Sequence, residues 1–217
     1  MTTTILLADD HSITREGLKS LIARAEHMEI IGEADNGRIA VEKALELAPD
    51  LVILDISMPE LNGIQAATQI LKKRPETKIL ALSMFADRRY VTSMLKAGAS
   101  GYLLKNCISK EIIDAVNTIN RGRRYLSPEI QEMVMDDFIN GRHTDEDFQI
   151  NMLTCREKEI LQLISEGFGA LQIADRLHIS EKTVSTHRRK IMDKLNVHTV
   201  AGLTKVAIRE GLTRLAD

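Results

Sequence analysis

The sequence predicts two domains: an α/β domain built as a doubly wound, five-stranded parallel sheet, and a smaller all-α domain that follows it. Across the first 121 residues, short continuous apolar runs alternate with longer segments of helical periodicity, as expected of buried parallel strands joined by helices. Beyond that region the strand signal disappears and only helical patterns remain. At 217 residues the chain is also long enough for two domains.

Five strands and five helices are expected to alternate in the first domain. The apolar runs place the strands at residues 4–9, 28–33, 51–55, 78–83 and 101–104. The helical patterns lie at residues 13–25, 37–47, 62–73, 87–97 and 109–120, with Ser109 as a suitable N-cap of the last one. The short connections predict an open sheet with helices on both faces.

A polar, acidic segment separates the two domains. Ser127-Pro128 predicts the start of a further helix with Pro128 at its first position, and residues 141–147 have the polar composition of a linker. We therefore expect a first domain at 1–121, a helical segment with an acidic linker at 122–150, and a second domain at 151–217.

The second domain is predicted to contain a helix-turn-helix. Its first helix starts at a capping box formed by Thr154 and Glu157 and is ended by Gly167. Further helices are expected at residues 170–177, at 181–195 with Ser180 as the N-cap, and at 199–209. Two helices joined by a tight turn, the second of them basic, have the outline of this DNA-binding motif.

Charge is distributed unevenly along the chain. Residues 1–121 carry 15 Lys/Arg and 16 Asp/Glu, residues 122–150 carry 3 and 7, and residues 151–217 carry 11 and 8. The cation excess in the last segment points to a polyanion as a partner. The two cysteines, Cys107 and Cys155, make no disulfide framework and fit a reducing cytosol. No apolar run approaches the roughly 20 residues that span a bilayer, so we expect a cytoplasmic protein without membrane contact.

Charged residues close three of the predicted strands. Asp9 and Asp10 follow the first apolar run, Asp55 ends the third, and Lys105 follows the fifth. Parallel strands deliver their carboxyl ends to one edge of a sheet, so three carboxylates and one ammonium should meet there. Carboxylates packed together need a cation, and Mg²⁺ suits this set, with the backbone carbonyl of Ser57 as a further ligand. The lysine points to a second anion, for which phosphate is the best fit.

Asp55 is the candidate nucleophile at this edge. A carboxylate can attack phosphorus and form an acyl phosphate when the charges of both groups are neutralised. Asp10, together with Asp9 through a water molecule, would hold the Mg²⁺. Lys105 would pair with one phosphoryl oxygen, and Ser83, at the end of the fourth predicted strand, would donate its hydroxyl to another.

The first domain resembles a response-regulator receiver domain. The residues that carry the resemblance are Asp9-Asp10, the segment Asp55-Ile-Ser-Met-Pro-Glu-Leu-Asn-Gly63, Ser83, and Gly101-Tyr-Leu-Leu-Lys105. The resemblance implies a flavodoxin-like fold and phosphotransfer from a sensor histidine kinase to Asp55. It also implies a switch in which Ser83 moves toward the phosphate and Tyr102 turns inward. Asn106 departs from the family, because many receivers have proline there, preceded by a cis peptide bond.

The predicted helix at 181–195 has the features of a recognition helix. Residues 181–194 include five cations and two acids, and at about 100° per residue Val184, Ile191 and Leu195 face inward. The candidates for contacts to base edges are Ser185, Thr186 and Arg189, of which Arg189 suits guanine. The candidates for contacts to phosphates are Lys182, Thr183, Arg188, Lys190 and Lys194, with His187 packed or beside a phosphate.

Residues 153–207 resemble the LuxR-type helix-turn-helix of the NarL/FixJ group of regulators. The resemblance rests on Leu153-Thr-x-Arg156-Glu157-x-Glu159-Ile-Leu161, Gly167, Ile173-Ala174, Leu177-x-Ile179-Ser180, Thr183-Val184-x-x-His187 and Lys194-Leu195-x-Val197. It implies a two-component response regulator that dimerises when phosphorylated and binds double-stranded promoter DNA, with RNA polymerase as a further partner. Relatives often have lysine at Ser185 and asparagine at Lys190, so the operator sequence does not transfer by analogy.

Two other classes of function compete with a phosphoacceptor regulator. Phosphatases of the haloacid-dehalogenase type also use a strand-end aspartate beside Mg²⁺, but they need an acid two residues later, where this chain has Ser57. A constitutive DNA binder with an unphosphorylated receiver is the other alternative, and the complete acidic set argues against it. We therefore expect a regulator that takes part in phosphotransfer to its own Asp55 and is not an enzyme.

Overall fold

The computed structural model describes residues 2–84, 86–139 and 149–213. The chain divides into two units, Met1–His143 and Thr144–Asp217. The linker predicted at residues 141–147 falls outside the described residues. Among the residues that are described, no helix is long and apolar enough to cross a membrane.

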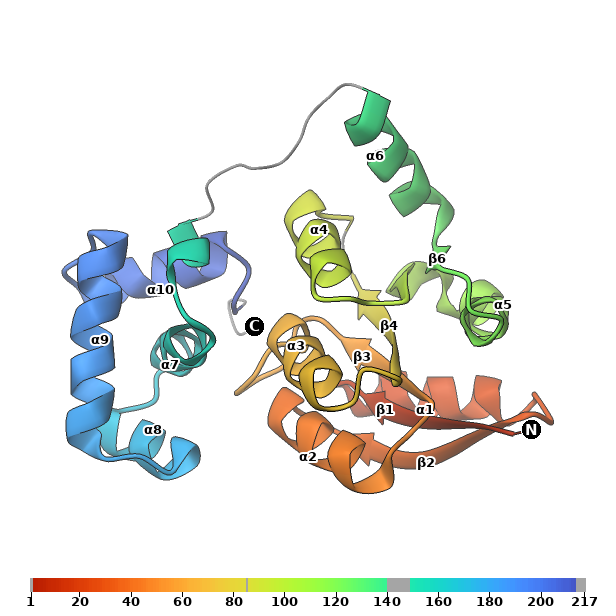
Figure 1. The fold of residues 1–217 in the computed structure, drawn as a ribbon, viewed down its shortest axis with the longest axis horizontal. Coiled ribbons are helices and arrows are strands. Elements are labelled where there is room, and N and C mark those ends of the chain that lie inside the picture. The colour runs from red at the N-terminus through yellow and green to blue at the C-terminus, as the bar shows by residue number, and fades with distance from the viewer. Residues whose placement is uncertain (1, 85, 140–148, 214–217) are drawn as a thin grey trace. The chain divides into compact units, whose positions relative to one another are not determined.

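A parallel sheet forms the centre of the first unit (Figure 1). The strand order is β2-β1-β3-β4-β5-β6, and each neighbouring pair runs in parallel. The bounds are β1 Thr3–Ala8, β2 Met28–Ala34, β3 Leu51–Asp55, β4 Lys78–Ser83, β5 Gly101–Leu104 and β6 Tyr125–Leu126. The five predicted strands are therefore confirmed, and the predicted strand count is short by one.

The sixth strand is an addition of two residues at the β5 edge. The Tyr125 N–H donates to the Ser100 carbonyl at 3.1 Å, and the Ser127 N–H donates to the Tyr102 carbonyl at 3.0 Å. The Tyr125 hydroxyl donates to Glu111 at 2.7 Å, which holds the new strand against α5 (Ile108–Asn120). A strand of two residues has no period to detect, which explains why the sequence pattern missed it.

Helices cover both faces of the sheet, as predicted. Ile5, Leu7, Ile53 and Leu103 share a core with α1 and α5, whereas Leu6, Val52, Ala81 and Tyr102 share a core with helices on the other face. Alternate residues of each strand thus point to opposite faces, as expected of buried strands. The remaining helix bounds of the first unit are α1 Ser12–Ile22, α2 Gly37–Leu47, α3 Gly63–Lys73, α4 Arg88–Lys96 and α6 Pro128–Ile139.

The starts of α6 and α5 show where the local sequence signal holds and where it fails. Pro128 is the first residue of α6, as predicted, and Ile130 anchors that helix in the core of the first unit. The predicted start of α5 is wrong, because the helix begins at Ile108 directly after a 3₁₀ turn at Lys105–Cys107. Ser109 therefore lies inside the first turn, and the N-cap is Cys107, which makes no side-chain capping bond.

Close backbone packing places Asp55 at the carboxyl edge of the sheet. The Gly63 N–H donates to the Ile56 carbonyl at 2.8 Å, so α3 starts against the end of β3. A Cβ atom at Gly63 would lie 2.1 Å from the Asp55 carbonyl oxygen, so a glycine is required there. The strand order reverses between β1 and β3, which is where ligands bind in sheets of this kind.

The second unit is all-helical, as predicted. Its elements are the 3₁₀ turn Gln149–Met152, α7 Cys155–Ser165, α8 Ala170–Leu177, α9 Glu181–Leu195 and α10 Val200–Arg209. The predicted capping box at the start of α7 is present, and Ser180 caps α9 by accepting from the Thr183 N–H at 3.1 Å. His178 ends α8 in a left-handed conformation, which makes the tight turn between α8 and α9.

Candidate functional site: an acidic strand edge and a basic helix

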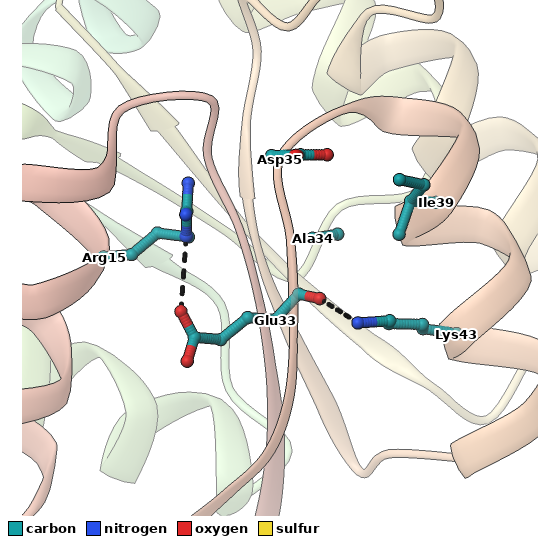
Figure 2. Close-up of a pocket in the computed structure, with 6 residues that line it drawn as sticks. All are labelled: Arg15, Glu33, Ala34, Asp35, Ile39 and Lys43. Atoms are coloured by element: carbon teal, nitrogen blue, oxygen red, sulfur yellow. Dashed lines mark hydrogen bonds and ion pairs between the residues drawn. The ribbon is translucent and has the colours of Figure 1, made fainter.

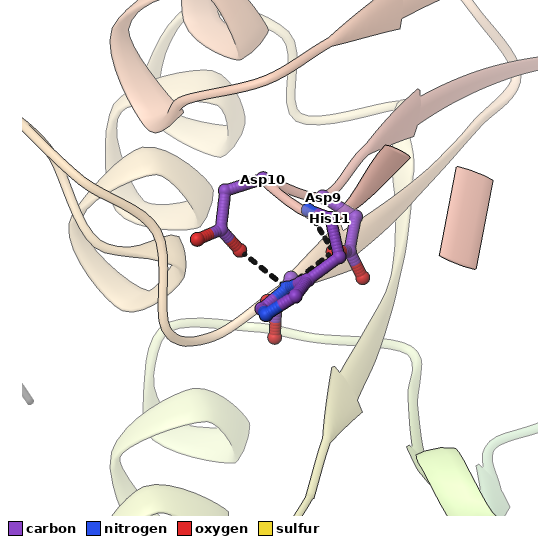
Figure 3. A group of neighbouring side chains, drawn as sticks. Asp9, Asp10 and His11 are labelled. Atoms are coloured by element: carbon purple, nitrogen blue, oxygen red, sulfur yellow. Dashed lines mark hydrogen bonds and ion pairs between the residues drawn. The ribbon is translucent and has the colours of Figure 1, made fainter. Parts of the chain in front are cut away.

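Three acidic residues and one histidine meet at the carboxyl ends of β1 and β3. One potential ligand atom from each of Asp9, Asp10, His11 and Asp55 lies within 4.8 Å of the others, and Figure 3 shows the first three side chains turned toward one another. Asp9 and Asp55 are only 1% and 2% exposed. The carboxylate oxygens of this set are hard donors that fit a divalent cation such as Mg²⁺.

Lys105 lies between two of these carboxylates. Its Nζ atom is 2.6 Å from Asp9 Oδ2 and 2.9 Å from Asp55 Oδ2. Burial works to lower the pKa of Lys105, but the charges of Asp55 and Asp9 outweigh burial and hold that pKa above its ordinary value. The lysine therefore stays charged and neutralises part of the acidic cluster.

Asp55 is held in an environment that disfavours its charged form. Burial raises the pKa of this carboxyl, the Lys105 charge opposes that effect, and the Asp9 charge adds to it, so the net pKa lies above its ordinary value. Its Oδ1 atom accepts the Ser57 N–H at 3.3 Å. The role of the Ser57 carbonyl as a ligand remains a prediction.

Ser83 and Tyr102 lie together on the neighbouring strands β4 and β5. Tyr102 is fully buried, and its hydroxyl shares a hydrogen bond with the Ser83 side chain. Burial raises the Tyr102 pKa, while that hydrogen bond works in the opposite direction. The ring thus faces inward. After Lys105, Asn106 follows through a trans bond, as no peptide bond among the described residues is cis.

Charged residues behind the acidic cluster support Asp9 through Arg15, and none of them was among the predicted site residues. Arg15, on α1, donates from Nη1 to the Asp9 carbonyl at 2.7 Å, and its Nε lies 3.3 Å from Glu33. Figure 2 shows Arg15 and Lys43 on opposite sides of Glu33, whose carbonyl accepts from Lys43 Nζ at 2.6 Å. These residues line a cavity of about 150 Å³. The available signal was the position of Arg15, one helical turn beyond the acidic pair.

The predicted recognition helix presents its polar side chains to solvent. Val184, Ile191 and Leu195 are buried, which confirms the predicted inward face of α9. The proposed DNA-contacting side chains are all exposed or half-exposed: Lys182, Thr183, Ser185, Thr186, His187, Arg188, Arg189, Lys190 and Lys194. They form a continuous polar surface along one helix.

Three of these nine side chains already have partners within the second unit. The Thr183 hydroxyl oxygen lies 2.8 Å from the Ser180 hydroxyl oxygen, within hydrogen-bond distance. Lys194 Nζ lies 2.6 Å from Glu157 Oε2, and the Glu157 side chain is only 4% exposed. The Thr186 hydroxyl donates to the Lys182 carbonyl one turn earlier at 2.9 Å. Lys194 therefore ties α9 to the start of α7, a role that the sequence pattern did not reveal.

Comparisons with known proteins match both halves of the chain. The family model of the response regulator receiver domain matches residues 5–117, and that of bacterial regulatory proteins of the luxR family matches residues 151–207. The oxygen regulatory protein NreC of Staphylococcus epidermidis is 40% identical over 213 residues, which cover 96% of this chain and 98% of that protein. The transcriptional regulatory protein DegU of Brevibacillus brevis is 34% identical over 226 residues, with 97% and 95% covered.

A solved structure agrees in fold. RcsB from Salmonella enterica serovar Typhimurium, bound to a promoter in the presence of beryllofluoride, matches with a TM-score of 0.62 at 23% identity, covering 98% of this chain and 100% of that one. The matches together define a regulator made of a receiver domain and a LuxR-type DNA-binding domain. The chain belongs to the two-component response regulators of the NarL/FixJ group, which regulate transcription.

Proposed function

We propose that Asp55 accepts a phosphoryl group from a sensor histidine kinase, and that this modification controls dimerisation and binding to promoter DNA. The observation that carries the proposal is the position of Lys105, whose ammonium lies between the carboxylates of Asp55 and Asp9 at a buried edge. A fixed cation beside a cluster of acids prepares the site for a further cation and for an anion.

The phosphoacceptor site would hold one Mg²⁺ ion. Its ligands would be the carboxylates of Asp10 and Asp55 and the backbone carbonyl of Ser57, with the Asp9 carboxylate holding the ion through a water molecule. When bound, Mg²⁺ neutralises charge on the acceptor carboxylate and on the transferred phosphoryl oxygens. The chemistry of the donor atoms, which are oxygens apart from the imidazole of His11, supports this choice of cation.

The transfer is a displacement at phosphorus. One carboxylate oxygen of Asp55 attacks, the bond from phosphorus to the kinase imidazole breaks, and the imidazole leaves with that electron pair. Lys105 then pairs with one phosphoryl oxygen, and the Ser83 hydroxyl donates to another. Because the Ser83 side chain is hydrogen-bonded to the buried Tyr102 hydroxyl, movement of Ser83 changes the contacts of Tyr102. This change shifts the equilibrium between two receiver states.

In the second unit, α9 would enter the major groove of double-stranded promoter DNA. Ser185, Thr186 and Arg189 would face base edges, with Arg189 on guanine. The remaining polar residues of the helix would contact phosphates: Lys182, Thr183, His187, Arg188, Lys190 and Lys194. A phosphorylated homodimer would place two such helices on paired half-sites and act on RNA polymerase. For this function we assign residues 1–121 as receiver, 122–150 as linking segment and 151–217 as DNA-binding domain.

The proposal is tested by sedimentation and DNA binding with and without beryllofluoride and Mg²⁺. Wild type should shift toward a dimer and bind promoter DNA more tightly when both are added. Asp55→Asn should show neither change, because it has no carboxylate to carry the phosphoryl analogue. If the additions change neither the assembly state nor the DNA affinity of wild type, although it binds DNA, the receiver is an unphosphorylated scaffold.

A further inference from the structure

We propose that His11 is a ligand of the divalent cation at the acidic edge, and that it shifts the preference of the site toward transition ions such as Mn²⁺. This inference rests on the proposed function, because it concerns the same cation. From the sequence alone, His11 follows the acidic pair and is expected to be a helix-start residue rather than a metal ligand.

The geometry around the imidazole is that of neighbouring ligands. His11 Nδ1 lies 2.9 Å from Asp10 Oδ1 and 3.2 Å from Asp9 Oδ1. Ligands at about 2.1 Å from one octahedral ion lie about 3 Å apart when they occupy adjacent positions. The two distances from His11 Nδ1 match the spacing of adjacent ligands, and Asp55 supplies a further oxygen within the same 4.8 Å cluster.

Neither helix capping nor packing explains the direction of this ring. His11 occupies the N-cap position of α1, but its side chain makes no capping hydrogen bond, so the imidazole is not there to start the helix. Its side chain is 49% exposed, so packing does not hold it either. The backbone does contribute, because the His11 N–H donates to Asp9 Oδ1 at 2.8 Å and fixes that carboxylate beside the ring.

An imidazole ligand changes which cation the site prefers. Mg²⁺ selects oxygen donors, whereas imidazole nitrogen suits first-row transition ions, whose affinities also rise along the series from Mn²⁺. Three carboxylates alone would favour Mg²⁺. The same carboxylates with one nitrogen donor retain Mg²⁺ binding and add affinity for Mn²⁺.

The competing explanation is that His11 is only a counter-cation. A protonated imidazole would lie at the same distances from Asp9 and Asp10, held by charge, and would leave when a metal ion binds. The two explanations differ in one observable, which is a bond between the metal and a histidine nitrogen.

Pulsed electron paramagnetic resonance of bound Mn²⁺ measures that bond. Wild-type protein with ¹⁵N only at its histidines should show coupling of Mn²⁺ to ¹⁵N. The signal should vanish in His11→Phe, which keeps an aromatic ring of similar size. It should persist in His27→Phe, a matched change at an exposed histidine whose ring contacts Asn117 at 2.8 Å. Wild type that binds Mn²⁺ without nitrogen coupling overturns the proposal.

Calorimetric titration adds an independent readout. Loss of the imidazole should weaken Mn²⁺ binding by about tenfold or more and weaken Mg²⁺ binding far less; equal loss for both ions contradicts the proposal. Failure of this inference can be distinguished from failure of the proposed function. If Mn²⁺ binds without nitrogen coupling and the protein still takes up beryllofluoride at Asp55, only the role of His11 is ruled out. Wild type that binds neither cation removes the proposed function as well.

Discussion

Replacing Lys194 with methionine separates its structural contact from its proposed contact with DNA. In the structure its ammonium lies 2.6 Å from Glu157, whose side chain is 4% exposed. Removing one partner of a fully buried ion pair costs about 3–5 kcal/mol. Two observations reduce that figure here: the Lys194 side chain is 36% exposed, and Glu157 keeps its hydrogen bond from the Thr154 N–H at 2.8 Å.

We therefore expect Lys194→Met to lower the free energy of unfolding of the second unit by about 1–2 kcal/mol. For a unit of this size the unfolding midpoint should fall by about 5–15 °C. Thermal unfolding followed by circular dichroism measures the shift, and hydrogen exchange at amides of α7 and α9 assigns it to this unit. The matched control is Lys190→Met, which removes an exposed lysine from the same helix.

The effect should also depend on pH. Burial works to raise the pKa of Glu157, but hydrogen bonds from Lys194 and Thr154 outweigh it, so the pKa lies below its ordinary value of 4.5. A carboxyl with a lowered pKa stabilises the fold above its unfolded pKa and loses that contribution as the pH falls through its folded pKa. The difference between Lys194→Met and wild type should therefore be full at neutral pH and shrink below about pH 4.

The two lysine variants should behave differently on DNA as well. Lys190→Met should leave stability nearly unchanged and reduce the slope of log affinity against log salt by about one. Lys194→Met should instead lower the free energy of unfolding of the second unit. If both variants lose the same small amount of stability and show the same decrease in salt slope, the ion pair does not hold α9. That result refutes the reasoning from burial.

Three further predictions concern both units. Without divalent ions, Asp55→Asn should raise the unfolding midpoint near neutral pH, because the raised pKa of Asp55 marks a charge that burial disfavours. This gain in unfolding midpoint should vanish in acid, where the wild-type carboxyl is protonated. A gain that persists in acid contradicts this cause. Gly63→Ala should cost about 2 kcal/mol or more in chemical denaturation, because its Cβ would lie 2.1 Å from the Asp55 carbonyl oxygen, whereas Gly17→Ala, with nothing within 4 Å, should be neutral or stabilising. Arg189→Ala should relax base preference at one operator position and cost about 1–3 kcal/mol of binding free energy there. An unchanged base preference in a binding-site selection would show that Arg189 does not contact a base.

Much of the fold follows from patterns that are local in sequence. Strand β3 (Leu51–Asp55) is a continuous apolar run ended by a charge, and its place at the sheet centre follows from that composition. Helix α9 was predicted with its bounds because Ser180 caps it and three inward apolar residues repeat at helical spacing. The meeting of Asp9, Asp10, Asp55 and Lys105 follows from the parallel topology alone.

The parts that were missed depend on contacts that no local pattern encodes. Strand β6 exists because Tyr125 and Ser127 reach unpaired groups at the β5 edge. The start of α5 is set by the 3₁₀ turn after Lys105, which overrides the capping preference of Ser109. The partner of Lys194 lies on another helix, and the direction of the His11 ring depends on side-chain torsions that the sequence does not specify.

The most direct test of the account is intact-mass spectrometry after incubation with acetyl phosphate and Mg²⁺, followed by peptide mapping. The account predicts that wild type gains the mass of one phosphoryl group, that the mapped peptide contains Asp55, and that Asp55→Asn gains nothing. A folded wild type that gains no mass, or an Asp55→Asn variant that gains as much as wild type, would contradict the assignment of Asp55 as the phosphoacceptor.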